Sequence, residues 1–155
     1  MPAEVAASGV APVPAGRVAT LARAFEALQP ATLEALLAFY AEDARFKDPF
    51  NEVEGRAAIG AIFRHMFAAL EAPRFVVHEQ VAAGAQAFLA WEMHYRLRRL
   101  VRAPMVIRGA SHLRFDDAGL VTEHRDYWDA AEEFYAKLPF VGGLMRWLAR
   151  QGAAT

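Results

Sequence analysis

The chain has 155 residues, 55% of them hydrophobic and 23% charged, which is enough to build one domain with a core and excludes disorder throughout. Its 17 basic and 18 acidic residues leave a formal charge of -1, so no global field favours a nucleic acid partner. The absence of cysteine excludes disulfides, thiolate catalysis and Cys-ligated metals, and is compatible with a cytoplasmic location. No apolar run approaches the roughly 18 residues of a membrane span, so no membrane partner is expected.

The first sixteen residues are rich in proline and glycine and lack the basic start and leucine-rich stretch of a secretory signal. We therefore expect a disordered arm over residues 1–16 and a single domain over residues 17–150. Apolar residues at helical spacing predict a first helix from Arg17 to Leu28. Beyond Pro30, Thr32 is expected to cap a short second helix whose apolar stripe ends at Tyr40. A third helix is predicted from Gly55 to Leu70, ended by Pro73.

After the third helix the apolar spacing changes to a period of two, which predicts strands. The clearest strand spans 86–98, with the inner face Ala87, Leu89, Trp91, Met93, Tyr95 and Leu97. Further strands are predicted over 105–115 and 120–128, joined by a turn at 116–119. A helical pattern returns at 130–137, breaks at Pro139 and Gly142-Gly143, and resumes to Leu148. Helices followed by a run of strands indicate an α+β domain in which helices cover one face of a strongly bent antiparallel sheet.

The segment from Tyr40 to Pro49, the helix opened by Glu54-Gly55-Arg56 and the closing strands resemble the nuclear transport factor 2-like superfamily. That superfamily includes ketosteroid isomerases, polyketide cyclases, scytalone dehydratase, limonene epoxide hydrolase and many binding modules. The resemblance covers about Arg17 to Trp128. It implies a cone-shaped α+β barrel, with three N-terminal helices on a mainly antiparallel sheet, and a homodimer formed through the outer sheet face.

Asp48, in an aspartate-proline pair after the second helix, matches the catalytic base of the ketosteroid isomerases. Ser111 stands where those enzymes have an oxyanion-binding carboxylic acid, and Ala24 or Phe25 where they have an oxyanion tyrosine. The resemblance thus implies the scaffold and the base without either oxyanion donor. Independently, Asp-Pro is a common turn pair, so Asp48 could instead form a turn.

Residues two apart on a strand share a face, so His124 and Asp126 point the same way, and the resemblance turns them and Ser111 toward the pocket. A carboxylate can orient a neighbouring imidazole and stabilise its cation, which makes this pair a candidate for acid/base work. An aspartate of the polyketide cyclases is similar in position to Asp126. The alternative is that both are buried polar groups that only bond one another. The large side chains expected to bind substrate are Phe25, Tyr40, Phe63, Trp91, Leu113 and Trp128.

Neither a metal nor a cofactor is expected. His124-Arg125-Asp126 has the His-x-Asp spacing of a non-haem iron site, but no third ligand follows it. There is no G-x-S-x-G elbow and no glycine-rich phosphate loop. We predict either an acid/base enzyme acting on a small, largely apolar carbonyl compound, of isomerase, cyclase or dehydratase type, or a non-catalytic module that binds a small ligand or a protein.

The C-terminal tail carries the large apolar residues Phe134, Leu138, Phe140, Leu144, Trp147 and Leu148. If these groups were all exposed, they would form a contiguous apolar patch prone to association. Residues 140–148 are therefore expected to form a lid or a dimer clamp. Packing that completes the core is the alternative.

Overall fold

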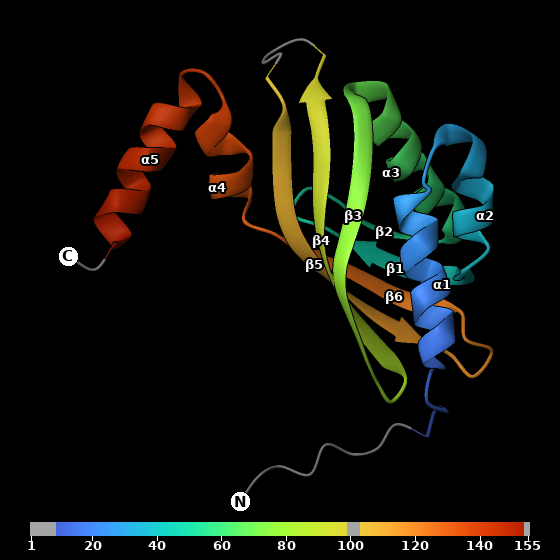
Figure 1. Ribbon diagram of the computed structural model, residues 1–155. Coiled ribbons are helices and arrows are strands. Elements are labelled where there is room, and N and C mark those ends of the chain that lie inside the picture. Colours follow the sequence, from blue (N-terminus) through green and yellow to red (C-terminus); the bar gives the residue numbers. More distant parts are fainter. Residues whose placement is uncertain (1–8, 99–102, 154–155) are drawn as a thin grey trace, which may run out of the picture.

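The structure is a computed structural model that describes residues 9–98 and 103–153. Six strands form one sheet, in the order β2-β1-β6-β5-β4-β3, and three N-terminal helices pack against one of its faces (Figure 1). The helices and 3-10 turns are α1 (Ala15–Glu26), η1 (Pro30–Thr32), α2 (Leu33–Leu37), α3 (Arg56–Ala69), α4 (Ala130–Glu133), η2 (Tyr135–Lys137) and α5 (Val141–Gly152). The strands are β1 (Tyr40–Lys47), β2 (Glu52–Glu54), β3 (Leu70–Ala83), β4 (Gln86–Leu97), β5 (Met105–Phe115) and β6 (Val121–Tyr127).

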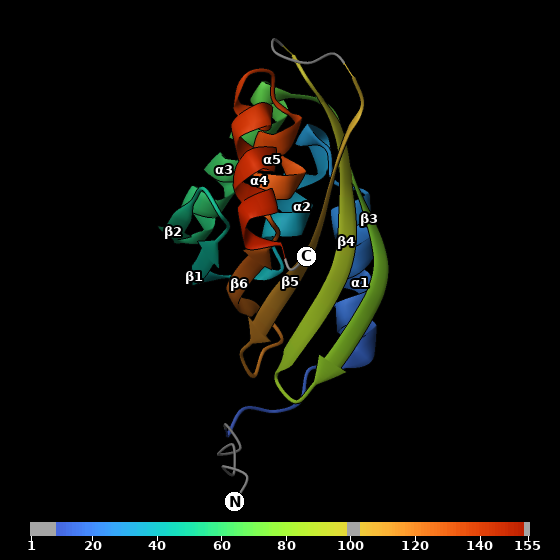
Figure 2. The same cartoon turned by 90° about the vertical axis from the view of Figure 1, so that its left-hand side faces the viewer.

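The predicted α+β class and the mainly antiparallel sheet are confirmed. Strand β1 pairs with β6 in parallel, and the other neighbouring strands are antiparallel. Strands β3, β4 and β5 curve strongly along their length (Figure 2). The sheet stays open, however, with β2 and β3 at its two edges, so the expected barrel is not closed.

The β4 and β5 pattern predicted from the sequence is present and builds the core. Leu89, Trp91 and Tyr95 are buried on the inner face, and Trp91 is only 7% exposed. They pack with apolar residues of the helices such as Leu21 and Ile59, which are fully buried. The turn predicted between the last two strands is also present, with Gly119 at a φ of 73° that favours glycine.

Two predicted boundaries are wrong. The second helix ends at Leu37, and Tyr40 begins β1 instead, because it pairs with Val121 of β6. Pro73 does not end the third helix: β3 already starts at Leu70 and runs through it. Pairing with β4 is irregular between Glu71 and Arg74, and β3 is an edge strand, where proline is tolerated.

Part of the expected N-terminal arm packs on the domain. The backbone N–H of Val13 donates to Gly84 O at 2.9 Å, and the Val13 side chain is buried. Ala15 and Gly16 already belong to α1, which follows directly on Pro14. The prediction of a free arm thus differs from the structure over residues 11–16, while residues 1–8 lie outside the described residues.

The tail is helical, as predicted, and its helical pattern breaks around Pro139, but not at the predicted Gly142-Gly143. Gly142 and Gly143 sit inside the first turn of α5, and the chain turns instead at Phe140, whose φ is 64°. Helix α5 lies on the side of the sheet away from α1, α2 and α3 (Figure 1). Large apolar side chains at the start of α5 and along it are exposed, so they do not complete the core of this chain as one alternative expected: Phe140, Val141, Leu144, Trp147 and Leu148. Within the described ranges no helix is long and apolar enough to cross a membrane.

Candidate functional site

A chain of side-chain hydrogen bonds crosses four strands of the inner sheet face. Ser111 Oγ on β5 and His124 Nε2 on β6 lie 2.5 Å and 2.7 Å from Asp126 Oδ1. Trp91 Nε1 on β4 donates to Ser111 Oγ at 2.8 Å, and Tyr40 Oη on β1 lies 2.7 Å from His124 Nδ1. The structure thus brings together three of the four predicted catalytic residues, Ser111, His124 and Asp126.

The register of β5 and β6 explains why these residues meet. Ser111 pairs directly with Asp126, and Leu113 pairs with His124, so all four inner-face side chains stand side by side. Trp91 pairs with Gly109, and the missing side chain there leaves room for its indole ring. Alternation along the strands therefore places the polar groups together, as the sequence predicted for Ser111, His124 and Asp126.

The indole of Trp91 fixes the direction of the first half of this chain. An indole N–H can only donate, so the Ser111 hydroxyl accepts from Trp91 and has its own proton free for Asp126. The hydrogen bonds from Ser111 and His124 both end on Oδ1 of Asp126. That oxygen is therefore occupied, and Oδ2 is the oxygen of Asp126 left for a ligand.

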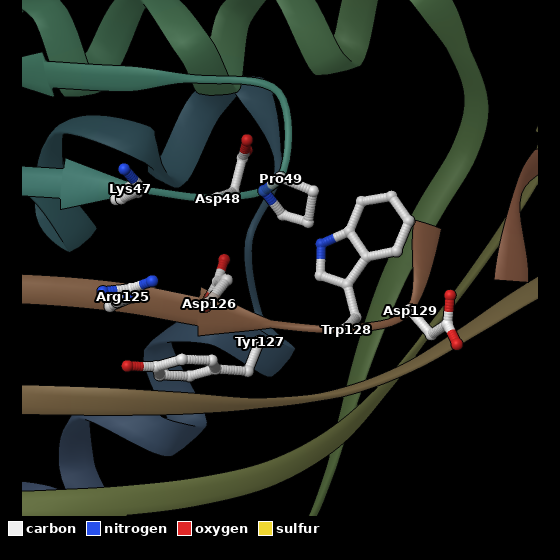
Figure 3. Close-up of a pocket in the computed structure, with 8 residues that line it drawn as sticks. All are labelled: Lys47, Asp48, Pro49, Arg125, Asp126, Tyr127, Trp128 and Asp129. Carbon is white, nitrogen blue, oxygen red and sulfur yellow. The ribbon is translucent and has the colours of Figure 1, made fainter. Parts of the chain in front are cut away.

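Asp126 lies between two cavities. An inner cavity of about 20 Å³ is lined by Phe25, Phe63, Phe75, Val77, Leu89, Trp91, Ser111, His124 and Asp126. An outer pocket of about 550 Å³ is lined by Lys47, Asp48, Pro49, Arg125, Asp126, Tyr127, Trp128 and Asp129 (Figure 3). The inner cavity has room for about one water molecule, whereas the outer one has the size of a small-molecule site.

Asp48, the fourth predicted catalytic residue, lies in the outer pocket but outside the hydrogen-bond chain. Its carboxylate points away from Asp126, toward the connection between β1 and β2 (Figure 3). Oδ1 accepts the backbone N–H groups of Phe50 and Asn51, each at 2.7 Å, and the Asn51 amide donates to both carboxylate oxygens. This is the geometry of an Asx turn, which the sequence analysis gave as the alternative.

The predicted substrate-binding residues fall into three groups. Phe25, Phe63 and Trp91 line the inner cavity, and Trp128 lines the outer pocket. Leu113 is fully buried and lines neither cavity. Tyr40 is fully buried as well and contacts His124 instead of open space.

The sequence analysis missed the aromatic cluster beside the outer pocket. The ring of Phe50 packs edge-on against Trp128, Phe134 and Tyr135, at centroid distances of 5.3, 5.7 and 6.2 Å. This cluster joins the tail to the connection between β1 and β2. The signal available in the sequence was the aromatic pair Phe134-Tyr135. The helical pattern around this pair does not show that it contacts Phe50, which lies far away along the chain.

Two cations that were not predicted from the sequence, Lys47 and Arg125, also line the outer pocket. Lys47 Nζ binds Glu52 at 2.6 Å, and the guanidinium of Arg125 lies 4.8 Å from the centre of the Tyr127 ring. Strand alternation turns both away from the inner face, which is why the sequence pattern did not select them. Across the described residues no group of three histidine, aspartate or glutamate side chains is placed to hold a metal ion.

Comparison with known proteins adds a family and a set of similar folds. A model of the SnoaL-like domain matches residues 21–124. No functionally curated protein shows a sequence match. A protein from Catenulispora acidiphila with a ketosteroid isomerase-like fold, solved with trimethylamine, is 19% identical over 78% of this chain and 90% of its own, with a TM-score of 0.66.

Two further solved structures carry named activities. A putative polyketide cyclase from Xanthomonas campestris is 22% identical over 76% of this chain and 90% of its own, with a TM-score of 0.61. An LEH-like epoxide hydrolase from M. tuberculosis is 21% identical over 86% of this chain and 95% of its own, with a TM-score of 0.60. At these identities the likeness establishes the fold, which is the one expected from the resemblance.

Proposed function

This chain belongs to the SnoaL-like family, and on that premise we propose that it is an acid/base enzyme acting on a small, largely apolar carbonyl compound. The reaction is of isomerase, cyclase or dehydratase type and uses side chains alone. The observation that carries the proposal is Asp126, whose Oδ1 accepts two hydrogen bonds while the same carboxylate lines a pocket of about 550 Å³. A partly buried carboxylate with this support costs desolvation that a purely structural strand has no need to meet.

In the proposed reaction Asp126 Oδ2 takes a proton from the carbon next to the carbonyl. The electron pair of the broken C–H bond moves toward the carbonyl oxygen, and Asp126 later returns the proton to a second position or assists loss of water. The developing negative charge needs donors at the carbonyl oxygen. Ser111 and His124 already direct hydrogen bonds to Asp126, so the cations Lys47 and Arg125 of the outer pocket are the candidates for this role.

Asp48 has a supporting part in this proposal. Its carboxylate holds the turn at Phe50 and Asn51, and so it positions the wall of the outer pocket that faces Trp128. The assignment of the proton-transfer role to Asp126 instead of Asp48 rests on their different hydrogen-bond partners.

The experiment measures proton exchange directly. The protein is incubated in D₂O with a panel of apolar cyclic ketones and aryl β-keto esters, and NMR follows deuterium incorporation next to the carbonyl. We expect catalysed exchange that falls by about 10²-fold or more in Asp126→Asn, the typical contribution of a general base. Asp48→Asn should lose far less. Glu123→Gln is the matched control, because Glu123 lies on the same strand with its side chain exposed and paired with Arg114.

A binding module is the second candidate, favoured by the inner cavity of only about 20 Å³. The outer pocket then binds a small ligand between the carboxylates Asp48, Asp126 and Asp129 and the Trp128 ring. The panel therefore includes trimethylamine, the molecule bound to the similar Catenulispora acidiphila protein. Saturable binding without deuterium exchange, together with an affinity that falls only a few-fold in Asp126→Asn, would decide for this function.

We also propose that the protein is a homodimer formed through the outer sheet face. Phe88 is 45% exposed there, and its ring stacks on His112 at 4.4 Å between centroids. Val81 on the neighbouring strand is exposed as well. Light scattering at micromolar concentration should give the mass of two chains, and the Phe88→Glu variant should give the mass of one.

The proposed cytoplasmic location would be checked by fractionating cells that express the protein.

A further inference from the structure

Tyr40 is held rigidly at the start of β1. Its side chain is 0% exposed, and it pairs with Val121 at the only parallel junction in the described sheet. Its carbonyl oxygen accepts two hydrogen bonds from the guanidinium of Arg56, at 3.0 and 2.6 Å. These backbone contacts of Tyr40 fix its hydroxyl beside His124, and no ligand is needed to hold it there.

Counting protons at this contact leaves one arrangement in which every polar group is satisfied. If His124 carried its proton on Nδ1, the Tyr40 oxygen would accept it, and the hydroxyl proton would need another acceptor. His124 is the hydroxyl's one hydrogen-bond partner among the described residues, and a buried unpaired donor is strongly disfavoured. With the proton on Nε2, Tyr40 donates to the Nδ1 lone pair, and His124 donates to Asp126 Oδ1.

We infer that Tyr40 holds His124 as the neutral Nε2–H tautomer and is a positioning residue for Asp126, instead of a wall of the substrate pocket. This inference rests on the proposed function for the catalytic role of Asp126. His124 then serves as a fixed donor that orients the carboxylate and supports its negative charge. Proton transfer to and from substrate belongs to Asp126 Oδ2 alone.

The surroundings of the imidazole hold its ring in place between Tyr40 and Asp126. Phe25 of α1 and Phe46 of β1 pack edge-on against the ring, at centroid distances of 5.6 and 4.9 Å, and His124 is only 2% exposed. Asp126 and Tyr40 are the described titratable groups in contact with the ring, and the uncharged hydroxyl of Ser111 lies 3.3 Å from Nε2. Burial, and then the charge of Asp126, raise the pKa of Tyr40 well above its usual value, so its hydroxyl keeps the proton it donates.

The first test uses nitrogen NMR of the full chain labelled with ¹⁵N-histidine, without any ligand. We expect His124 to show a protonated Nε2 and an unprotonated, hydrogen-bonded Nδ1. A protonated Nδ1 would overturn the inference. Because no substrate is present, this result does not depend on the proposed function.

The second test removes single hydroxyl groups. Tyr40→Phe should shift the Nδ1 signal of His124 and the ¹³C signal of the Asp126 carboxyl, and lower kcat by about 10- to 100-fold at nearly constant KM, as partners that orient a reacting group do. Tyr95→Phe is the matched control, since Tyr95 is a buried tyrosine of the same sheet face whose hydroxyl has no hydrogen-bond partner. Unmoved signals in Tyr40→Phe would refute the positioning role. Moved signals in a protein without exchange activity would leave the tautomer standing and remove only the catalytic role.

Discussion

The position of Trp91 depends on the absence of a side chain at Gly109. These residues face one another across β4 and β5, and a Cβ atom built on Gly109 would lie 2.6 Å from the indole ring. The ring in turn lies on the inner cavity and donates to Ser111. A glycine in mid-strand, usually unfavourable, is here the condition for the first link of the hydrogen-bond chain.

We expect Gly109→Ala to destabilise the protein by about 1–3 kcal/mol, the usual cost of extra volume in a packed core. Denaturant unfolding followed by tryptophan fluorescence measures this, and the native emission should shift as the indole moves. The control is Gly143→Ala, where nothing lies within 4 Å of the new methyl group. Equal stabilities for both variants would show that Trp91 does not need the gap.

At the scale of elements, strands were predicted better than the tail. Alternation from Gln86 to Arg98 specified which residues of β4 face inward, because one face is buried and the other is not. Tyr40 was assigned to a helix because a large apolar residue at helical spacing fits either structure, and pairing with β6 decided it. The role of Asp48 could not be read from Asp-Pro alone, since its partners Phe50 and Asn51 become visible only in the folded turn.

Helix α5 packs little against the rest of the protein, so it should contribute little to the free energy of unfolding. Helix α5 is joined to the preceding residues by two hydrogen bonds, from Gly142 N–H to Leu138 O and from the Arg146 guanidinium to Ala136 O, while most of its apolar side chains are exposed. A chain that ends after Leu138 should therefore fold, with a melting temperature within a few degrees of the full protein, because little buried surface is lost. Differential scanning calorimetry checks this. Loss of cooperative unfolding would show instead that α5 is structural, and a change from dimer to monomer would make it a dimer clamp.

At the scale of the whole molecule, the titration of Tyr95 affects how the free energy of unfolding changes at alkaline pH. Burial, and then the charge of Glu133, raise the pKa of Tyr95 to about 12, whereas an unfolded tyrosine titrates near 10. The folded state thus holds this proton more tightly, so its contribution is complete below about pH 10 and is lost as the pH rises toward 12.

We expect Tyr95→Phe to lose less stability than the wild type between about pH 10 and pH 12, because the replaced group no longer titrates. At neutral pH the variant should be at least as stable, since the Tyr95 hydroxyl is the one buried side-chain polar atom of the described residues without a partner. Urea unfolding at several pH values gives both results. Parallel pH curves for the two proteins would contradict the assignment.

The parallel pairing of β1 with β6 has a consequence for biosynthesis. The contact between Tyr40 and His124 joins residues 84 positions apart, so β1 leaves the ribosome long before the strand that will cover it. Until then its inner face, with Tyr40 and Phe46, has no strand beside it in the growing sheet except the three residues of β2. Closure of such a distant pair is slow because the loop entropy comes first. The hydrogen-bonded cluster around Asp126 is therefore among the last parts of the protein to be assembled, and a chain that ends before β6 contains neither His124 nor Asp126.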